Sequence, residues 1–174
     1  MNLKNSELSL NASEELNLIS SGSDIQIDEL KNLKMNSSKD KFVLGSVDSI
    51  DGELKFSVMD IKSLGQKISA NMKITDLKIF QIRSVHPSIV IDQDSSDIEI
   101  NVWGAEFQFN GNYTEGVVRL PKTFKNISSE LIDKGKKIRT IQADYGNKSD
   151  GKISVSGYKG SLIFKEVKWS NDQY

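Results

Sequence analysis

Residues 97–120, DIEINVWGAEFQFNGNYTEGVVRL, carry the clearest local pattern in the sequence. Apolar and polar residues alternate on both sides of the pair Asn110-Gly111. Alternation of this kind is typical of a strand with one buried face, and Asn-Gly is typical of a two-residue hairpin turn. The stretch therefore predicts a β-hairpin with one apolar face.

The same signals recur along most of the chain. Asp51-Gly52 predicts a second hairpin turn. Residues 121–135 predict the one helix, which begins at Pro121 and ends at Gly135. Further short strands are predicted near residues 42–47, 53–59, 68–74, 79–85, 88–91, 137–143, 152–156 and 161–167. We therefore expect a mainly β protein, an antiparallel β-sandwich of the jelly-roll or Ig-like type with one short helix.

A short repeat precedes this region. The tetrapeptides ELSL, ELNL and DIQI begin at Glu7, Glu15 and Asp24, in steps of eight and nine residues. Such copies bury their apolar side chains by stacking on one another, as in a β-solenoid or an intertwined needle. Three short antiparallel strands, or a loosely attached arm, fit the same pattern. The polar run NSSKDK predicts a boundary between a β-repeat or attachment arm, residues 1–35, and a sandwich domain, residues 36–174.

Two parts of the chain resemble known families. Residues 8–12 and 21–27 resemble the needle repeats of phage baseplate spikes and of type VI secretion tip proteins, where rows of the form I-x-L-x-A and S-G-x-x-I-x-I recur. That resemblance implies an oligomeric, virion-like assembly. The last third resembles the closing strands of galactose-binding-like jelly rolls, which implies a carbohydrate-binding module. It departs from that family at Lys165-Glu166, where an Asp pair is usual.

Composition limits the partners. The chain has 174 residues, enough for one domain or one domain with a small appendage. Its 23 basic and 24 acidic residues are mixed along the sequence, so we expect neither nucleic acid nor membrane as a partner. There is no cysteine. Because no secretory signal and no long apolar run is present, we expect a soluble protein made in the cytoplasm, and a virion-associated one if it assembles.

Four carboxylates between two predicted strands form a candidate metal site. Asp92, Asp94, Asp97 and Glu99 offer the hard oxygen ligands that calcium prefers. A solvated acidic turn without an ion is the alternative. No other cofactor is expected.

Aromatic residues form the second candidate site. Tyr145 and Tyr158 fall in predicted turns, where an exposed ring could stack on a sugar or contact a partner protein. Trp103, Tyr113 and Trp169 are further candidates, and Trp103 could equally belong to the core.

No catalytic motif is present, so we expect no enzyme. His86 is the only histidine, and no G-x-S-x-G or comparable nucleophile motif accompanies it. Our leading hypothesis is a structural or interaction protein, a homo-oligomeric component of a phage tail or virion-like assembly with protein partners. The alternatives are a carbohydrate-binding β-sandwich module with a glycan ligand and a small inhibitor or immunity protein that caps a partner.

Overall fold

The computed structural model describes residues 1–147 and 150–168 and shows a mainly β protein, a β-solenoid of about six turns with no helix in those ranges. The predicted antiparallel sandwich, whether jelly-roll or Ig-like, is wrong, because most neighbouring strands are parallel. The solenoid interpretation of the N-terminal repeat is confirmed at the level of the fold. No helix long and apolar enough to span a membrane occurs in the described part of the chain.

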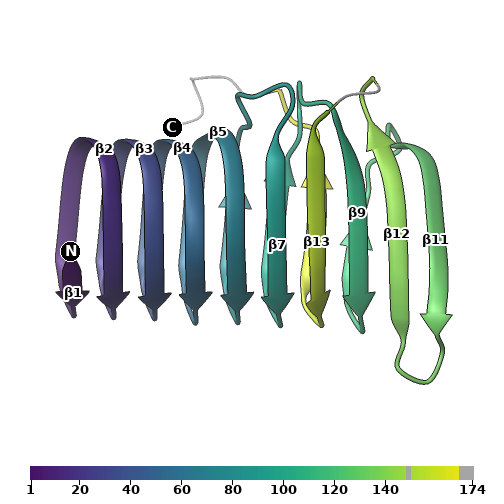
Figure 1. Ribbon diagram of the computed structural model, residues 1–174, viewed down its shortest axis with the longest axis horizontal. Helices are drawn as coiled ribbons and strands as arrows, with labels where there is room; N and C mark the ends of the chain where they lie inside the picture. The colour runs from purple at the N-terminus through teal and green to yellow at the C-terminus, as the bar shows by residue number, and fades with distance from the viewer. Residues whose placement is uncertain (148–149, 169–174) are drawn as a thin grey trace.

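In the residues that the structure describes, the solenoid is built from fourteen strands. Figure 1 labels those of the long sheet. They are β1 (Asn2–Lys4), β2 (Glu7–Ser21), β3 (Asp24–Ser38), β4 (Lys41–Lys55), β5 (Val58–Lys73), β6 (Asp76–Ile79), β7 (Ser88–Asp94), β8 (Asp97–Asn101), β9 (Phe107–Thr114), β10 (Val117–Arg119), β11 (Lys125–Asp133), β12 (Ile138–Tyr145), β13 (Lys152–Tyr158) and β14 (Ser161–Lys165).

Each of the first turns takes 17 residues. Glu7 pairs with Asp24, and Asp24 with Lys41, in parallel and in register. Position by position, the turns therefore place equivalent side chains above one another. The steps of eight and nine residues in the N-terminal repeat are the two halves of one such turn. Strand β3 crosses the predicted boundary at residues 35 and 36 and pairs with β4 along its length.

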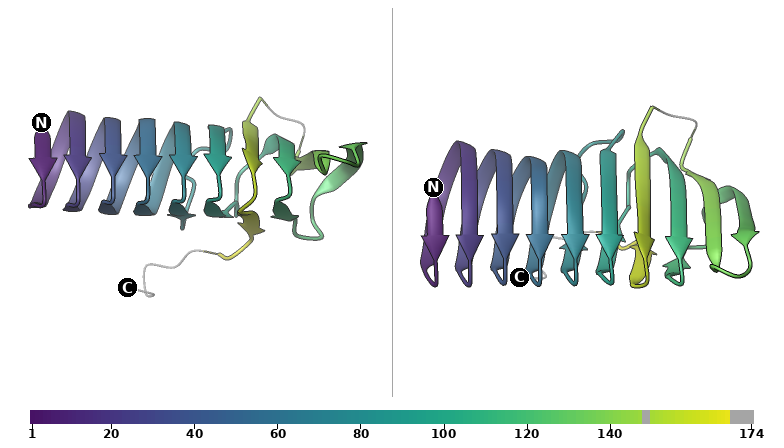
Figure 2. Two further views of the ribbon diagram at one scale, coloured as in Figure 1. Left: turned by 90° about the horizontal axis from the view of Figure 1, so that it is seen from below. Right: turned by 60° about the horizontal axis from the view of Figure 1, so that its bottom comes forward.

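Each turn contributes to two sheets that face each other across the core (Figure 2). The long sheet runs in the order β1-β2-β3-β4-β5-β7-β13-β9-β12-β11. The short sheet contains the first residues of β2 to β5, followed by β6, β8, β14 and β10. Inward-facing residues form columns such as Leu33, Ile50 and Ile68, all buried. Together these columns of apolar side chains form the core of the fold.

The order of the turns departs from the order of the chain near the C-terminus. Strand β13 lies between β7 and β9 and is parallel to both. Strand β14 lies between β8 and β10 in the same way. The C-terminal strands β13 and β14 thus lie between two turns whose residues come earlier in the sequence. Beyond β9, the antiparallel strands β12 and β11 close the long sheet.

Both predicted hairpin turns are wrong. Asn110-Gly111 lies inside β9 and Asp51-Gly52 inside β4, and β8 pairs with β6 and β14 instead of β9. The glycines are needed for close packing and not for a turn. A Cβ added at Gly52 would overlap the carbonyl oxygen of Met35 in the neighbouring strand. An Asn-Gly or Asp-Gly pair predicts a hairpin only when no third strand approaches it so closely.

The predicted helix over residues 121–135 is also wrong, because this segment forms strand β11. Its middle, ISSEL, has β-branched and serine residues with low helix propensity, and pairing with β12 decides its conformation. Asn126 has a positive φ of 51° next to one of two register shifts. The jelly-roll resemblance of the last third fails for a similar reason, since β13 and β14 are parallel solenoid strands.

Candidate interaction surfaces

The arch that joins the long sheet to the short sheet contains a buried polar ladder. Ser23, Asp40, Ser57, Thr75 and Ser96 occupy the same place in successive turns, each directly after a residue with positive φ. The N–H of Ser23 donates to Asp40 Oδ1 at 2.7 Å, and the N–H of Asp40 donates to Ser57 Oγ at 3.1 Å. The N–H of Thr75 donates to Ser96 Oγ at 3.1 Å. The ladder satisfies buried N–H groups at a sharp bend, where no strand partner can do so.

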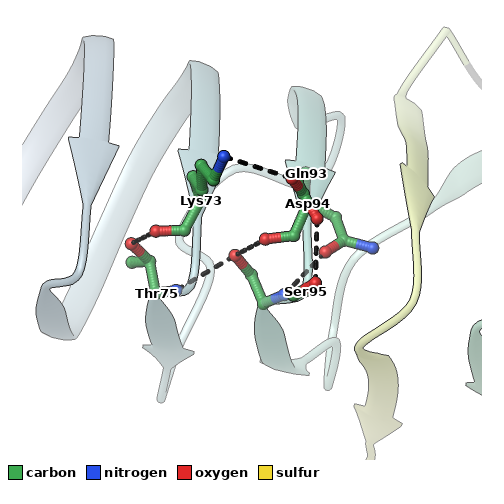
Figure 3. Close-up of polar contacts among 6 residues, drawn as sticks. Lys73, Thr75, Gln93, Asp94 and Ser95 are labelled. Carbon is green, nitrogen blue, oxygen red and sulfur yellow. Dashed lines mark hydrogen bonds and ion pairs between the residues drawn. The ribbon is translucent and has the colours of Figure 1, made fainter.

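A glutamine closes the ladder where the next turn has a glycine. Gly160 follows Ser96 in the stack and has no side chain to accept a hydrogen bond. The buried Gln93 fills that place, because its Oε1 accepts from the Ser96 N–H at 2.8 Å and its Nε2 donates to the Lys159 carbonyl at 2.7 Å. Figure 3 shows Gln93 beside Asp94 and Ser95, next to Thr75 of the preceding arch. Gln93 therefore links the early turns to the inserted C-terminal strands.

A shallow groove of about 600 Å³ lies on the outside of the long sheet beside this arch. Residues of strands β4, β5, β7, β13 and β9 line it, including Glu53, Asn71, Lys73, Asp92, Asp94 and Tyr158. Since five neighbouring strands contribute, the surface follows from the stacking of turns and not from one local motif. The sequence pattern gave no signal for Glu53 or Asn71, because only the 17-residue alignment of the turns brings them near Asp92.

The charged groups of the groove are partly paired within it. Lys73 Nζ lies 3.7 Å from Asp94 Oδ2, a pair that Figure 3 also shows, and Ser156 Oγ donates to Asp92 Oδ1 at 3.0 Å. The Tyr158 side chain is 44 % exposed, with Lys159 Nζ 5.0 Å from its ring centroid. The groove thus combines charged and amide groups with apolar surface and one accessible ring.

The structure does not bring the four predicted calcium ligands together. Asp92 and Asp94 lie in β7, before the arch, and Asp97 and Glu99 lie in β8, after it. Glu99 Oε1 lies 2.7 Å from Lys165 Nζ, and Asp97 Oδ1 accepts from Ser161 Oγ. Among the residues that the structure describes, no group of three His, Cys, Asp or Glu is placed to hold a metal ion. The calcium site thus stays a prediction without geometric support.

Of the predicted aromatic residues that the structure describes, only Tyr158 lines this groove. Tyr145 is buried in an aromatic cluster, with ring centroids 5.3 Å from Phe107 and 4.9 Å from Phe124. Its hydroxyl donates to Glu166 Oε1 at 2.7 Å, and burial together with that carboxylate raises the pKa of Tyr145 above its usual value. Trp103 is half exposed beyond the end of β8. Trp169 lies outside the described residues.

Tyr113 is the most buried of the predicted aromatic residues. It is 2 % exposed, and its hydroxyl has no hydrogen-bond partner among the residues that the structure describes. Burial alone raises the pKa of Tyr113 above its usual value. Its place in the core leaves it no surface for a ligand.

The fold defines the chain as a β-solenoid protein, and the groove beside Tyr158 lies on the outside of its long sheet. Comparison with known proteins finds no matching family model, no matching curated protein and no matching solved structure.

Proposed function

We propose that this β-solenoid is a non-enzymatic structural and interaction protein, a component of a phage tail or a comparable virion-like assembly. The observation that carries the proposal is the open N-terminal end. Strand β1 covers only residues 19–21 of β2. Along residues 7–12 of β2, the described chain places no strand on the outer edge.

An open edge of this kind favours assembly. Leu3, Leu8 and Leu10 pack against the core but stay only partly buried at this end. Unpaired backbone groups beside an apolar core are a template for another strand, and natural proteins usually cover or charge such edges. A partner that adds a strand here would extend the core by one more turn.

The test is association through this end. The double variant Leu8→Glu/Leu10→Glu places charges on the open core without touching the inner turns, and Val90→Glu, at an exposed site in the middle of the long sheet, is the matched control. Light scattering should show the same assembly for the parent chain and the control, and a smaller assembly for the double variant. A monodisperse monomer whose first 35 residues are rapidly cleaved by protease would contradict the proposal.

The groove beside Tyr158 favours a second candidate function, the binding of a glycan. An exposed ring next to Asn71 and Asp92 offers both stacking and hydrogen bonds to sugar hydroxyls. Screening on a glycan array should show binding that Tyr158→Ala removes. The control is Trp103→Ala, which removes an exposed ring that does not line the groove. If Tyr158→Ala binds the glycan as well as Trp103→Ala does, the groove is not the glycan-binding site.

A further inference from the structure

Strand β11 forms the other end of the long sheet (Figure 1). Its residues from Lys125 to Ile132 are exposed, so both of its faces are open to solvent. It pairs with β12 on one side, and no described residue pairs with its outer edge. Ile127 and Leu131, which are 53 % and 43 % exposed, project to the same side of the strand. That side faces the interior of the solenoid, because Ser129 between them pairs with the buried Ile141.

The end of the short sheet explains this exposure. Strand β10 is its last strand and pairs only with β14 among the described residues. The long sheet continues past it through β12 and β11. The inward side of β11 therefore has no opposite strand to cover it, and its two apolar side chains remain in solvent, as does Ile132 on the other side of the strand.

The sequence of β11 is complementary to itself in one antiparallel register. If Ser129 lies opposite Ser129 of a second copy, then Ile127 lies opposite Leu131 and Lys125 opposite Asp133, each pair twice. The two register shifts of β11, between Lys125 and Ser128 and between Leu131 and Asp133, lie opposite each other in this register, so they keep Lys125 opposite Asp133. Opposite residues in antiparallel strands share a face, which brings together the apolar pair and the ion pair.

Neighbouring registers and the parallel arrangement are less favourable. Centring the pair on Glu130 places two glutamates opposite each other, and centring it between Ser129 and Glu130 places Lys125 opposite Lys134. A parallel pair in register would stack Lys125 on Lys125. Like charges directly opposite destabilise a strand pair. The registers centred on Ser128, or between Ser128 and Ser129, place no two charged residues of β11 opposite each other. Of these antiparallel registers, the one centred on Ser129 is the one that forms an ion pair.

We propose that β11 pairs with β11 of a second copy of this chain, in the antiparallel register centred on Ser129, to form a two-fold dimer. The two-fold axis uses both free edges at once, so the interface closes at two chains. The dimer lies at the end of the solenoid opposite to the open N-terminal turn and goes beyond the proposed function. Because one strand per chain forms the interface, we expect a dissociation constant in the micromolar range.

Charge exchange tests the register. Lys125→Glu and Asp133→Lys each place two like-charge pairs in the dimer and should weaken dimerisation by about tenfold in sedimentation equilibrium. The double variant Lys125→Glu/Asp133→Lys restores opposite charges and should recover the affinity of the parent chain. Lys34→Glu, at an exposed site elsewhere on the long sheet, should have no effect. If the double variant instead loses dimer affinity by the sum of the two single losses, the proposed register is wrong.

Cysteine cross-linking tests the same register without relying on charge. The chain has no cysteine, so Ser129→Cys introduces a single thiol. In the proposed dimer the two thiols lie directly opposite, with Cα atoms about 5 Å apart, within the range of a disulfide. The control is Ser128→Cys, whose Cα atoms would be about 8 Å apart, beyond that range.

Mild oxidation should therefore link Ser129→Cys into dimers much faster than Ser128→Cys. Equal rates, or a parent chain that stays monomeric at all concentrations, would overturn the proposal. A dimer that resists the β11 variants but is lost in Leu8→Glu/Leu10→Glu would also overturn it, and would instead support association through the N-terminal end.

Discussion

Replacing Asp40 should destabilise the solenoid more than any other single change in the polar ladder. Its side chain accepts four hydrogen bonds, from Ser20 Oγ at 2.7 Å, Ser37 Oγ at 2.6 Å, the Ser23 N–H at 2.7 Å and the Ser38 N–H at 3.1 Å. Asp40 is 3 % exposed, so water cannot replace these bonds freely. Asp40→Ala leaves buried donors in two adjacent turns without an acceptor.

The magnitude follows from those donors. A buried donor without an acceptor costs about 1–3 kcal/mol. The Ser37 hydroxyl keeps an alternative contact with Ser57 Oγ at 3.3 Å, and Ser38 is only partly buried, so two donors carry most of the loss. We expect Asp40→Ala to lower the free energy of unfolding by about 3–4 kcal/mol, a large share of the stability of an ordinary domain.

The matched variant is Asp40→Ser, because serine already occupies the equivalent place in the next turn. Its hydroxyl can accept from the Ser23 N–H as Ser57 Oγ accepts from the Asp40 N–H. Asp40→Ser should therefore lose only about 1–2 kcal/mol. Urea unfolding gives the free energies, and hydrogen exchange over residues 20–40 shows whether the loss is local, as expected for stacked turns. Equal losses for the two variants would refute the ladder as the cause.

Of three further substitutions, two should raise the free energy of unfolding and one should lower it. Tyr113→Phe removes a buried unpaired hydroxyl and should raise the free energy of unfolding by up to about 1 kcal/mol. Since burial raises the pKa of Tyr113, the parent chain should lose stability as pH rises above about 10, and the phenylalanine variant should lose less in alkaline urea titrations. Gly52→Ala should cost about 2 kcal/mol or more in thermal unfolding, because the Cβ meets a backbone carbonyl that cannot move aside, whereas its strand partner Ala70 tolerates a methyl group. Ile74→Gly should stabilise the protein by about 1 kcal/mol, because Ile74 has a φ of 46° and Gly22 already occupies that arch position.

The strand content of the fold could be predicted from the sequence, but the way the strands stack could not. Alternation reports which side chains point inward, and a strand in a solenoid alternates as one in a sandwich does. The informative signal was the spacing. Leu8, Ile25, Phe42 and Met59 recur every 17 residues and stack directly, yet the repeat is visible by eye only over the first turns, where acids mark its halves. The spacing already widens within β5, where Ile50 pairs with Ile68, and it widens further where Lys67 pairs with Ser88.

The groove was predictable only in part, for the same reason. Asp92, Asp94 and Tyr158 were candidates from composition, but the insertion of β13 beside β7 decides that Tyr158 stands next to Asp94. Local patterns describe contacts between neighbours in the chain, and this pairing joins residues 64 positions apart. The expected exposure of Tyr145 failed because a predicted turn residue became the last residue of β12, packed against Phe107.

The ladder shows how such a fold could be recognised in a sequence without a visible apolar repeat. Each arch needs a residue that tolerates positive φ, followed by a small polar residue whose side chain accepts from the previous turn. The positive-φ residue itself varies, from Gly22 to Phe56 and Ile74, and so it hides the turn from any search for glycine or asparagine. The residue after it is Ser, Thr or Asp in every turn up to Ser96. In the next turn it is Gly160, and the side chain of Gln93 takes its place. A Ser, Thr or Asp that recurs at the spacing of the turns is therefore a better marker of this arch than the positive-φ residue before it. Hydrogen bonding to a buried N–H restricts the choice of side chain more tightly than the backbone conformation does.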